Sequence, residues 1–256
     1  MRLLHRRPAP AISWSDQEMF PHRLRRGDPS FYVDPVKPAT PSPAEETTEQ
    51  EDTADTGVTE FGWTQYDQDE INGTTYTNSI EVSSYNGTNP QMVIPEEIEG
   101  QPVRRIYYNS FYEAEITGAV VPDSVLYIGE NAFSYCKSLK SIDLGKGVQV
   151  IGNQAFYEAA ALEEITLPDS VTEIGVGTFM GCTSLKTADL GSSLTGIPAA
   201  AFANCSALES VTIPESVKTI ADNAFEGVDS ALVIYGSAGS AAEQYASQNG
   251  FDFEAA

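Results

Sequence analysis

The feature that most limits how this chain can fold is a unit of 23 residues that repeats through its second half. Five copies carry a phenylalanine at this constant spacing, namely Phe133, Phe156, Phe179, Phe202 and Phe225. Leucine recurs at the same interval in Leu139, Leu162, Leu185 and Leu208. Self-similarity at a period of about 20–50 residues is typical of solenoids and other repeat folds.

The apolar pattern within one copy predicts how each coil runs. Leu162-Glu-Glu-Ile-Thr-Leu167 alternates apolar and polar residues, as a short strand with one buried face does. Pro168–Ser170 then turns the chain, because proline has no N–H for a β-ladder, and Val171–Ile174 forms a second extended segment. Residues 177–183 are expected to form a helical or 3-10 turn that points Phe179 inward. A single coil cannot bury its own apolar edge, so the copies should stack at about 4.8 Å with their strands parallel.

Both ends of the repeat array carry signals for closing elements. Asn72-Gly73 separates two segments rich in aromatic and β-branched residues, which predicts a β-hairpin before the repeats. Ser240-Ala-Ala-Glu243 is a capping box, and Gly250 is suited to end the helix that it begins. The expected organisation is a disordered basic head and acidic Pro/Thr/Glu-rich tether over 1–57, a capping hairpin over 58–90, repeats over 91–232 and a C-terminal cap over 233–256.

The repeat motif is similar to that of a known family. Ile128-Gly129-Glu-Asn-Ala132-Phe133-Ser-Tyr-Cys136 matches every position of I-G-x-x-A-F-x-x-C, and the units resemble the leucine-rich repeats of BspA-like bacterial surface proteins. Ile94–Val103 resembles the longer entry repeat of that family, and the resemblance covers roughly residues 79–253. It implies an α/β fold, a right-handed leucine-rich-repeat solenoid of short parallel strands with helical or 3-10 turns. A hairpin would cap its N-terminal end and a helix its C-terminal end.

Residue types that perform catalysis are scarce in the repeats. Both histidines, His5 and His22, lie in the predicted head. The three cysteines each follow a core phenylalanine by three residues, which is typical of small buried hydrophobic side chains with free thiols. No basic partner recurs with them to activate a nucleophile, and their periodic placement does not bring four ligands together for zinc. We therefore expect a protein that is not an enzyme, with no cofactor and no metal site.

Charge and hydropathy restrict the class of partner. The formal net charge is −23, and residues 27–256 carry 35 acidic and 8 basic side chains. A surface this acidic repels phosphate backbones, so we expect no nucleic-acid binding. No stretch approaches about 18 consecutive apolar residues, so we expect no membrane insertion. The remaining expectation is a monomer that binds a protein or another macromolecule.

The outward positions of the first strand of each repeat form the candidate partner-binding face. They are small and polar, and the residues are Ser141, Asp143, Glu164, Thr166, Thr187, Asp189, Ser210 and Thr212. A merely solvated face is the alternative. A flat face of roughly 450 Å² falls below the about 800 Å² that each partner of a stable complex buries, which favours many weak contacts. Tyrosines that break the pattern could be interface anchors or could pack between coils: Tyr107, Tyr108, Tyr112, Tyr127 and Tyr157.

The resemblance implies a function and a location. The expected function is a non-enzymatic protein-interaction or adhesion module, and the alternative is an intracellular scaffold or partner-regulating repeat protein. The expected location is extracellular or at the cell surface. The N-terminus lacks the apolar region of a signal peptide, because Ala9–Trp14 is too short and interrupted, so a cytoplasmic location stays open.

Overall fold

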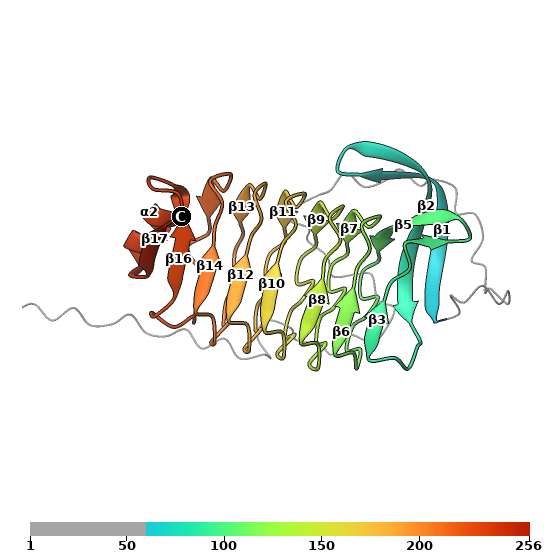
Figure 1. Ribbon diagram of the computed structural model, residues 1–256, viewed down its shortest axis with the longest axis horizontal. Helices are drawn as coiled ribbons and strands as arrows, with labels where there is room; N and C mark the ends of the chain where they lie inside the picture. Colours follow the sequence, from blue (N-terminus) through green and yellow to red (C-terminus); the bar gives the residue numbers. More distant parts are fainter. Residues whose placement is uncertain (1–59) are drawn as a thin grey trace, which may run out of the picture. The chain divides into compact units, whose positions relative to one another are not determined.

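The computed structural model describes residues 60–256, and the head and tether predicted over 1–57 lie outside them. The described residues form a solenoid in which coils follow one another in sequence order (Figure 1). Each coil has three sides. Two of them are parallel β-ladders, and the third consists of turns. The predicted fold class is confirmed, because strands that are 23 residues apart pair in parallel, as Glu164 does with Thr187.

The N-terminal hairpin precedes the coils. Strand β1 (Phe61–Ile71) pairs antiparallel with β2 (Thr74–Tyr85). The turn between them is Asn72-Gly73, with φ of 49° and 74°, the left-handed conformation that favours these two residue types. Strand β2 then pairs in parallel with β5 (Gln101–Ile106), which also pairs antiparallel with the short β4 (Glu97–Ile98). The predicted hairpin is therefore present and caps the first coil by continuing one of its ladders.

In most strands of the first side of the solenoid, the central residue is buried. Ala119, Ile165, Ala188 and Val211 are at most 5% exposed, which confirms the predicted alternation. These strands form two separate parallel sheets. One contains β3 (Gln91–Val93), β6 (Gly118–Val120) and β8 (Ser141–Asp143). The other contains β10 (Glu164–Thr166), β12 (Thr187–Asp189), β14 (Ser210–Thr212), β16 (Val233–Gly236) and β17 (Asp252–Ala255).

The second side carries the two-residue strands of the later half of each repeat. Strands β7 (Tyr127–Ile128), β9 (Val150–Ile151) and β11 (Glu173–Ile174) extend the ladder that begins with the hairpin and β5. Strands β13 (Gly196–Ile197) and β15 (Thr219–Ile220) pair with each other. In each pair an isoleucine points into the core, as Ile128 and Ile151 do.

The third side consists of successive turns in place of the helical or 3-10 turn expected there. The N–H of Phe133 donates to Ala155 O in the next coil at 2.7 Å, whereas the N–H of Ser134 donates to Asn131 O in its own coil at 3.1 Å. Every second N–H group thus bonds to the neighbouring coil and is not available for a helical hydrogen bond. Tyr135 has a φ of 59°, which also interrupts helical geometry. The turn conformation is therefore determined by stacking.

The repeated phenylalanines form a column through the core. From Phe133 to Phe225, neighbouring ring centroids lie 5.1–5.3 Å apart and the ring planes differ by 17° or less. Helix α2 (Ala241–Asn249) closes the column, with the Tyr245 ring 5.6 Å from that of Phe225. The predicted caps of this helix are observed. The Ser240 hydroxyl accepts a hydrogen bond from Glu243 N, and Gly250 has a φ of 78°.

The three cysteines, Cys136, Cys182 and Cys205, are buried and free. Each thiol donates to a phenylalanine carbonyl of the preceding coil, with Sγ–O distances of 3.0–3.2 Å. Burial raises the pKa of Cys136 and of Cys205 to about 12. We expect the native protein to react with a thiol reagent at least about a hundredfold more slowly than the unfolded protein, because the thiolate is the nucleophile. Mass spectrometry of labelled native protein checks this, and rapid labelling of any one cysteine would contradict it.

Candidate partner-binding face

The outward side chains of β3, β6, β8, β10, β12, β14 and β16 form two columns, which we call the front face. One column contains Ser141, Glu164, Thr187 and Ser210, and the other contains Asp143, Thr166, Asp189 and Thr212. Of these eight residues, seven are exposed and Ser210 is partly exposed. Each column is in register within its sheet, as with Thr166, Asp189 and Thr212. The eight residues proposed from the sequence therefore lie on one surface, but Ser141 and Asp143 belong to a different sheet from the other six.

A break in the β-ladder separates these two groups. Where the ladder is intact, the residue after one strand donates to the last residue of the next, as Val121 N does to Asp143 O and Leu167 N to Asp189 O, both at 2.8 Å. Among the hydrogen bonds of the described residues, no such bond joins Leu144 N to the end of β10, and β8 and β10 do not pair. The segments that precede these strands stay connected through Glu163 N and Lys140 O at 3.1 Å. The break therefore spans β8 and β10 themselves and leaves the segments before them connected.

The turn after β8 gives a physical reason for the break. Gly145 and Gly147 stand where the copies before and after have proline and serine. A Cβ atom at Gly145 would lie 2.1 Å from Pro122 O, and one at Gly147 would lie 2.1 Å from Asp123 O. Only glycine allows so close an approach to the preceding coil. We infer that this approach brings the end of β8 toward β6 and away from β10.

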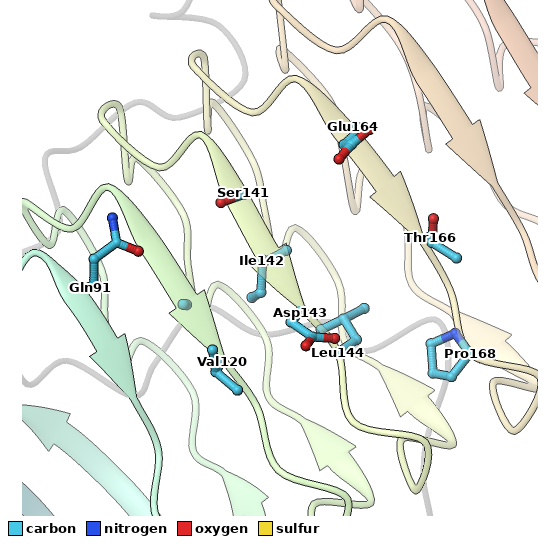
Figure 2. Close-up of a pocket in the computed structure, with 10 residues that line it drawn as sticks. Gln91, Val120, Ser141, Ile142, Asp143, Leu144, Glu164, Thr166 and Pro168 are labelled. Carbon is cyan, nitrogen blue, oxygen red and sulfur yellow. The ribbon is translucent and has the colours of Figure 1, made fainter.

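A shallow depression lies over the break (Figure 2). Its volume is about 530 Å³, and it is lined by Gln91, Ala119, Val120, Ser141, Ile142, Asp143, Leu144, Glu164, Thr166 and Pro168. Ile142 is half-buried, whereas the equivalent Ala119 and Ile165 in the strands on either side are buried. Sequence reasoning did not predict this depression. The available signal was the pair of glycines that replaces proline and serine in one copy.

The front face carries acidic charge alone. Asp143, Glu164 and Asp189 point outward, and no strand of the face contains a lysine or arginine. The two ion pairs among the described residues are Arg105–Asp69 and Lys186–Glu163, so Asp143 and Glu164 have no cationic partner there. Over residues 60–256 the sequence has 27 acidic and seven basic side chains. Asp143 and Glu164 therefore present their carboxylates to solvent without a cationic partner among the described residues.

The large apolar side chains that are most exposed on the front face lie at its N-terminal end. Val93 is 60% exposed and Val120 is 40% exposed, and the two residues are paired across β3 and β6. Val120 is also in register with Asp143 in the next strand. The depression therefore has an apolar side formed by β6 and an acidic side formed by β8 and β10.

The tyrosines that interrupt the repeat pattern lie outside the strands of the front face. Tyr157 is buried and its ring lies 5.2 Å from that of Tyr135, edge to face, which is packing between coils. Tyr127 lies in β7 on the second side, where the Arg105 guanidinium stacks over its ring at 5.0 Å. Tyr107, Tyr108 and Tyr112 are exposed on the turns that follow β5. The tyrosines therefore do not add anchors to the front face.

The hairpin is attached to the second side through a buried ionic cluster that sequence reasoning missed. The Nε of Arg105 donates to both carboxylate oxygens of Asp69, at 2.7 and 2.8 Å. Tyr66 donates its hydroxyl to Glu81 Oε1 at 3.1 Å, and Glu81 is 8% exposed. The tip of the hairpin reaches further, with Asn72 Nδ2 donating to Gln149 Oε1 at 3.3 Å. Arginine and carboxylates that are far apart in the sequence therefore hold the hairpin in place.

This cluster predicts a pH dependence of stability. Burial raises the pKa of Glu81 from 4.5 to about 7, with Asp69 acting in the same direction and Tyr66 and Arg105 opposing it. The folded form therefore favours the neutral acid, and the contribution of Glu81 to stability should fall as pH rises from about 5 to 8, by on the order of 2–3 kcal/mol. Denaturant unfolding at the two pH values measures this.

Isosteric variants isolate the contribution of Glu81. Glu81→Gln should be more stable than wild type at about pH 8 and equal to it at about pH 5, because glutamine stays neutral throughout. Glu164→Gln, which is exposed on the front face, is the matched control and should follow the wild-type profile. A Glu81→Gln variant that kept the full wild-type slope would show that this carboxyl does not cause it. Glu130, whose pKa is also raised to about 7 by burial, would then be the next group to replace.

Within residues 60–256, no group of three or more histidine, cysteine, aspartate or glutamate side chains is arranged to hold a metal ion. The same residues contain no helix that is long and apolar enough to cross a membrane.

Comparison with known proteins agrees with this architecture. The sequence pattern of the BspA type leucine rich repeat region matches residues 104–231 in six copies. Three solved structures share the fold. A leucine rich repeat protein of T. pallidum has 24% identity and a TM-score of 0.54, over 69% of this chain and 90% of that one. A leucine rich cell surface protein of Faecalibacterium prausnitzii A2-165 has 28% identity and a TM-score of 0.55, over 66% and 50%.

The pneumococcal vaccine antigen PcpA is also similar in fold, with 17% identity and a TM-score of 0.58, over 74% of this chain and 48% of that one. The chain thus spans about half the length of the F. prausnitzii and pneumococcal structures. Comparison with curated protein sequences found no match.

Proposed function

Because the chain belongs to the BspA type leucine-rich repeat family, we propose that it is a non-enzymatic adhesion or protein-interaction module that binds a macromolecular partner with its front face. The observation that carries this proposal is the front face itself. Its outward residues, from Ser141 to Thr212, are solvent-exposed and without a covering element among the described residues. Repeats of this kind present extended surfaces to partners. Weak contacts repeated over several copies of the module would suit adhesion.

An extracellular or cell-surface location is part of the proposal. It is supported by the structural similarity to the F. prausnitzii cell surface protein, which is 28% identical. An intracellular scaffold is the second candidate, and the three free, buried cysteines favour it, because a reducing compartment preserves thiols. Fractionation of native cells, followed by detection of the chain with an antibody, distinguishes the two. Recovery in the cytosolic fraction alone would reject the surface location.

Site-specific photocrosslinking tests the binding face. A photoreactive side chain placed at Thr166 or Thr187, both exposed on the front face, should form covalent adducts when the full chain is expressed in its native cells. The matched control position is Thr219, which is exposed on β15 of the second side. Adducts of the same mass from both front positions and none from Thr219 would support the proposal. Adducts from Thr219 alone would assign binding to another side of the solenoid.

A further inference from the structure

We propose that the depression over the β8–β10 break receives a lysine or arginine side chain from an extended basic segment of a partner protein. This inference rests on the proposed function and assigns the partner's chemistry. The first support is geometric. The break removes the ladder bonds between β8 and β10, leaves Ile142 half-exposed and coincides with a recess in the front face.

The lining of the depression matches the two parts of a basic side chain. Val120 and the partly exposed Ile142 form apolar surface on the β6 and β8 side, and Pro168 adds to it beyond β10. Lysine and arginine bury an apolar stem while they keep a charged head in polar surroundings. The head would lie between the carboxylates of Asp143 and Glu164, which point outward from neighbouring strands (Figure 2). An acidic or purely apolar side chain could contact the apolar part of this lining but would not complement the two carboxylates.

Charge complementarity selects the same occupant. Asp143 and Glu164 have no ion pair among the described residues, and no cationic side chain stands on the strands of the front face. The surrounding surface is strongly acidic, with 27 acidic and seven basic residues over 60–256. Such a field attracts a basic segment and orients it during encounter, while it repels acidic segments. The lining of the recess runs from Gln91 of β3 to Thr166 of β10, so an extended segment that crosses these strands would reach all of it.

The experiment uses the full chain and synthetic peptides. One peptide has a central arginine between two valines with serine and glycine flanks, and its counterpart has glutamine in place of the arginine. NMR titration of methyl groups detects weak binding. We expect saturable shifts at Ile142 and Val120 with the arginine peptide, and at least about tenfold weaker binding of the glutamine peptide. Free arginine amide tests whether an isolated cation is enough for binding to the depression. If it bound with the same affinity as the arginine peptide, a peptide segment would be rejected as the occupant.

Variants locate the binding site. Asp143→Asn combined with Glu164→Gln should weaken binding of the arginine peptide at least about tenfold. The matched control, Asp169→Asn combined with Glu226→Gln, removes the same charge at exposed positions outside the front-face strands and the depression, and should change the affinity less than about twofold. Gly145→Pro combined with Gly147→Ser introduces the residues of the copies before and after and should also weaken binding by closing the break. NMR spectra of the free variants establish that each is folded.

The outcomes separate this inference from the proposed function. No binding of the arginine peptide to the wild-type chain, or equal weakening by the two charge-removing variants, would overturn the assignment of a basic segment to the depression. Crosslinking from Thr166 would in that case still support a partner on the front face. Peptide binding with the expected variant pattern, but crosslinking from Thr219 alone, would reject the proposed function and leave the cation-binding depression intact.

Discussion

Replacing Phe179 with alanine should lower the free energy of unfolding by about 3–5 kcal/mol, the range for a large cavity in a well-packed core. The Phe179 ring is fully buried between those of Phe156 and Phe202, at 5.3 and 5.2 Å. Neighbouring coils cannot move in to fill the space, because backbone bonds such as Phe179 N to Ala201 O hold their spacing. Urea unfolding of the purified chain measures the loss.

Two variants serve as controls for this prediction. Phe225→Ala should cost less than Phe179→Ala, because Phe225 has a single phenylalanine neighbour in the column and α2 closes its other side. Thr166→Ala, on the exposed front face, should stay within about 0.5 kcal/mol of wild type. Small and equal effects of all three substitutions would contradict a single packed column. Because neighbouring coils stabilise one another, the cavity left by Phe179→Ala should also destabilise the coil before and the coil after its own.

Replacing Arg105 with methionine should destabilise the protein by about 3–5 kcal/mol, because it leaves a buried carboxylate without its counter-charge. The side chains of Arg105 and Asp69 are 16% and 6% exposed and 2.7 Å apart. Glu81 lies in the same cluster and would lose a favourable charge as well. Denaturant unfolding measures the total effect. Hydrogen exchange of the hairpin amides, from Phe61 to Tyr85, should rise most, since the ionic cluster anchors that element.

An exposed ion pair provides the matched control. Lys186 and Glu163 lie 3.8 Å apart with side chains more than half exposed, so Lys186→Met should cost less than about 1 kcal/mol. Adding Asp69→Asn to the Arg105→Met variant should recover part of the loss, because the asparagine carries no buried charge. An Arg105→Met variant as stable as Lys186→Met would show that water or backbone groups replace the guanidinium, and that the cluster does not anchor the hairpin.

Most of the fold is predictable because its determinants are local or periodic. Alternation within residues 162–167 predicts which side chains of one strand face inward, and the constant spacing of the phenylalanines predicts that they stack. Asn72-Gly73 predicts a hairpin because few other residue pairs adopt its backbone conformation. Ser240 and Gly250 mark the ends of α2 in the same local way. None of these inferences requires knowledge of how two coils fit together.

The candidate site is predictable in part for the same reason. Alternation places Asp143, Glu164 and Thr166 on the outside of their strands, where the structure has them. It does not reveal that β8 and β10 separate, because pairing depends on the distance between two coils. The third side differs from the expected helical turn for a similar reason. Its N–H groups bond to a neighbouring coil, whose position relative to them is absent from the motif of a single copy.

The sequence by itself determined the period, the inward and outward positions of each coil, the phenylalanine column and the two caps, because each depends on one residue's own conformational preference or on strict repetition. The tertiary structure alone decided where the front ladder breaks, that Ile142 becomes accessible there, and that Arg105 joins Asp69 across 36 positions of the chain. These features depend on close contacts between different coils or elements, such as Gly145 against Pro122 O. Contacts of this kind arise from packing in three dimensions, and a repeat motif averaged over its copies does not contain them.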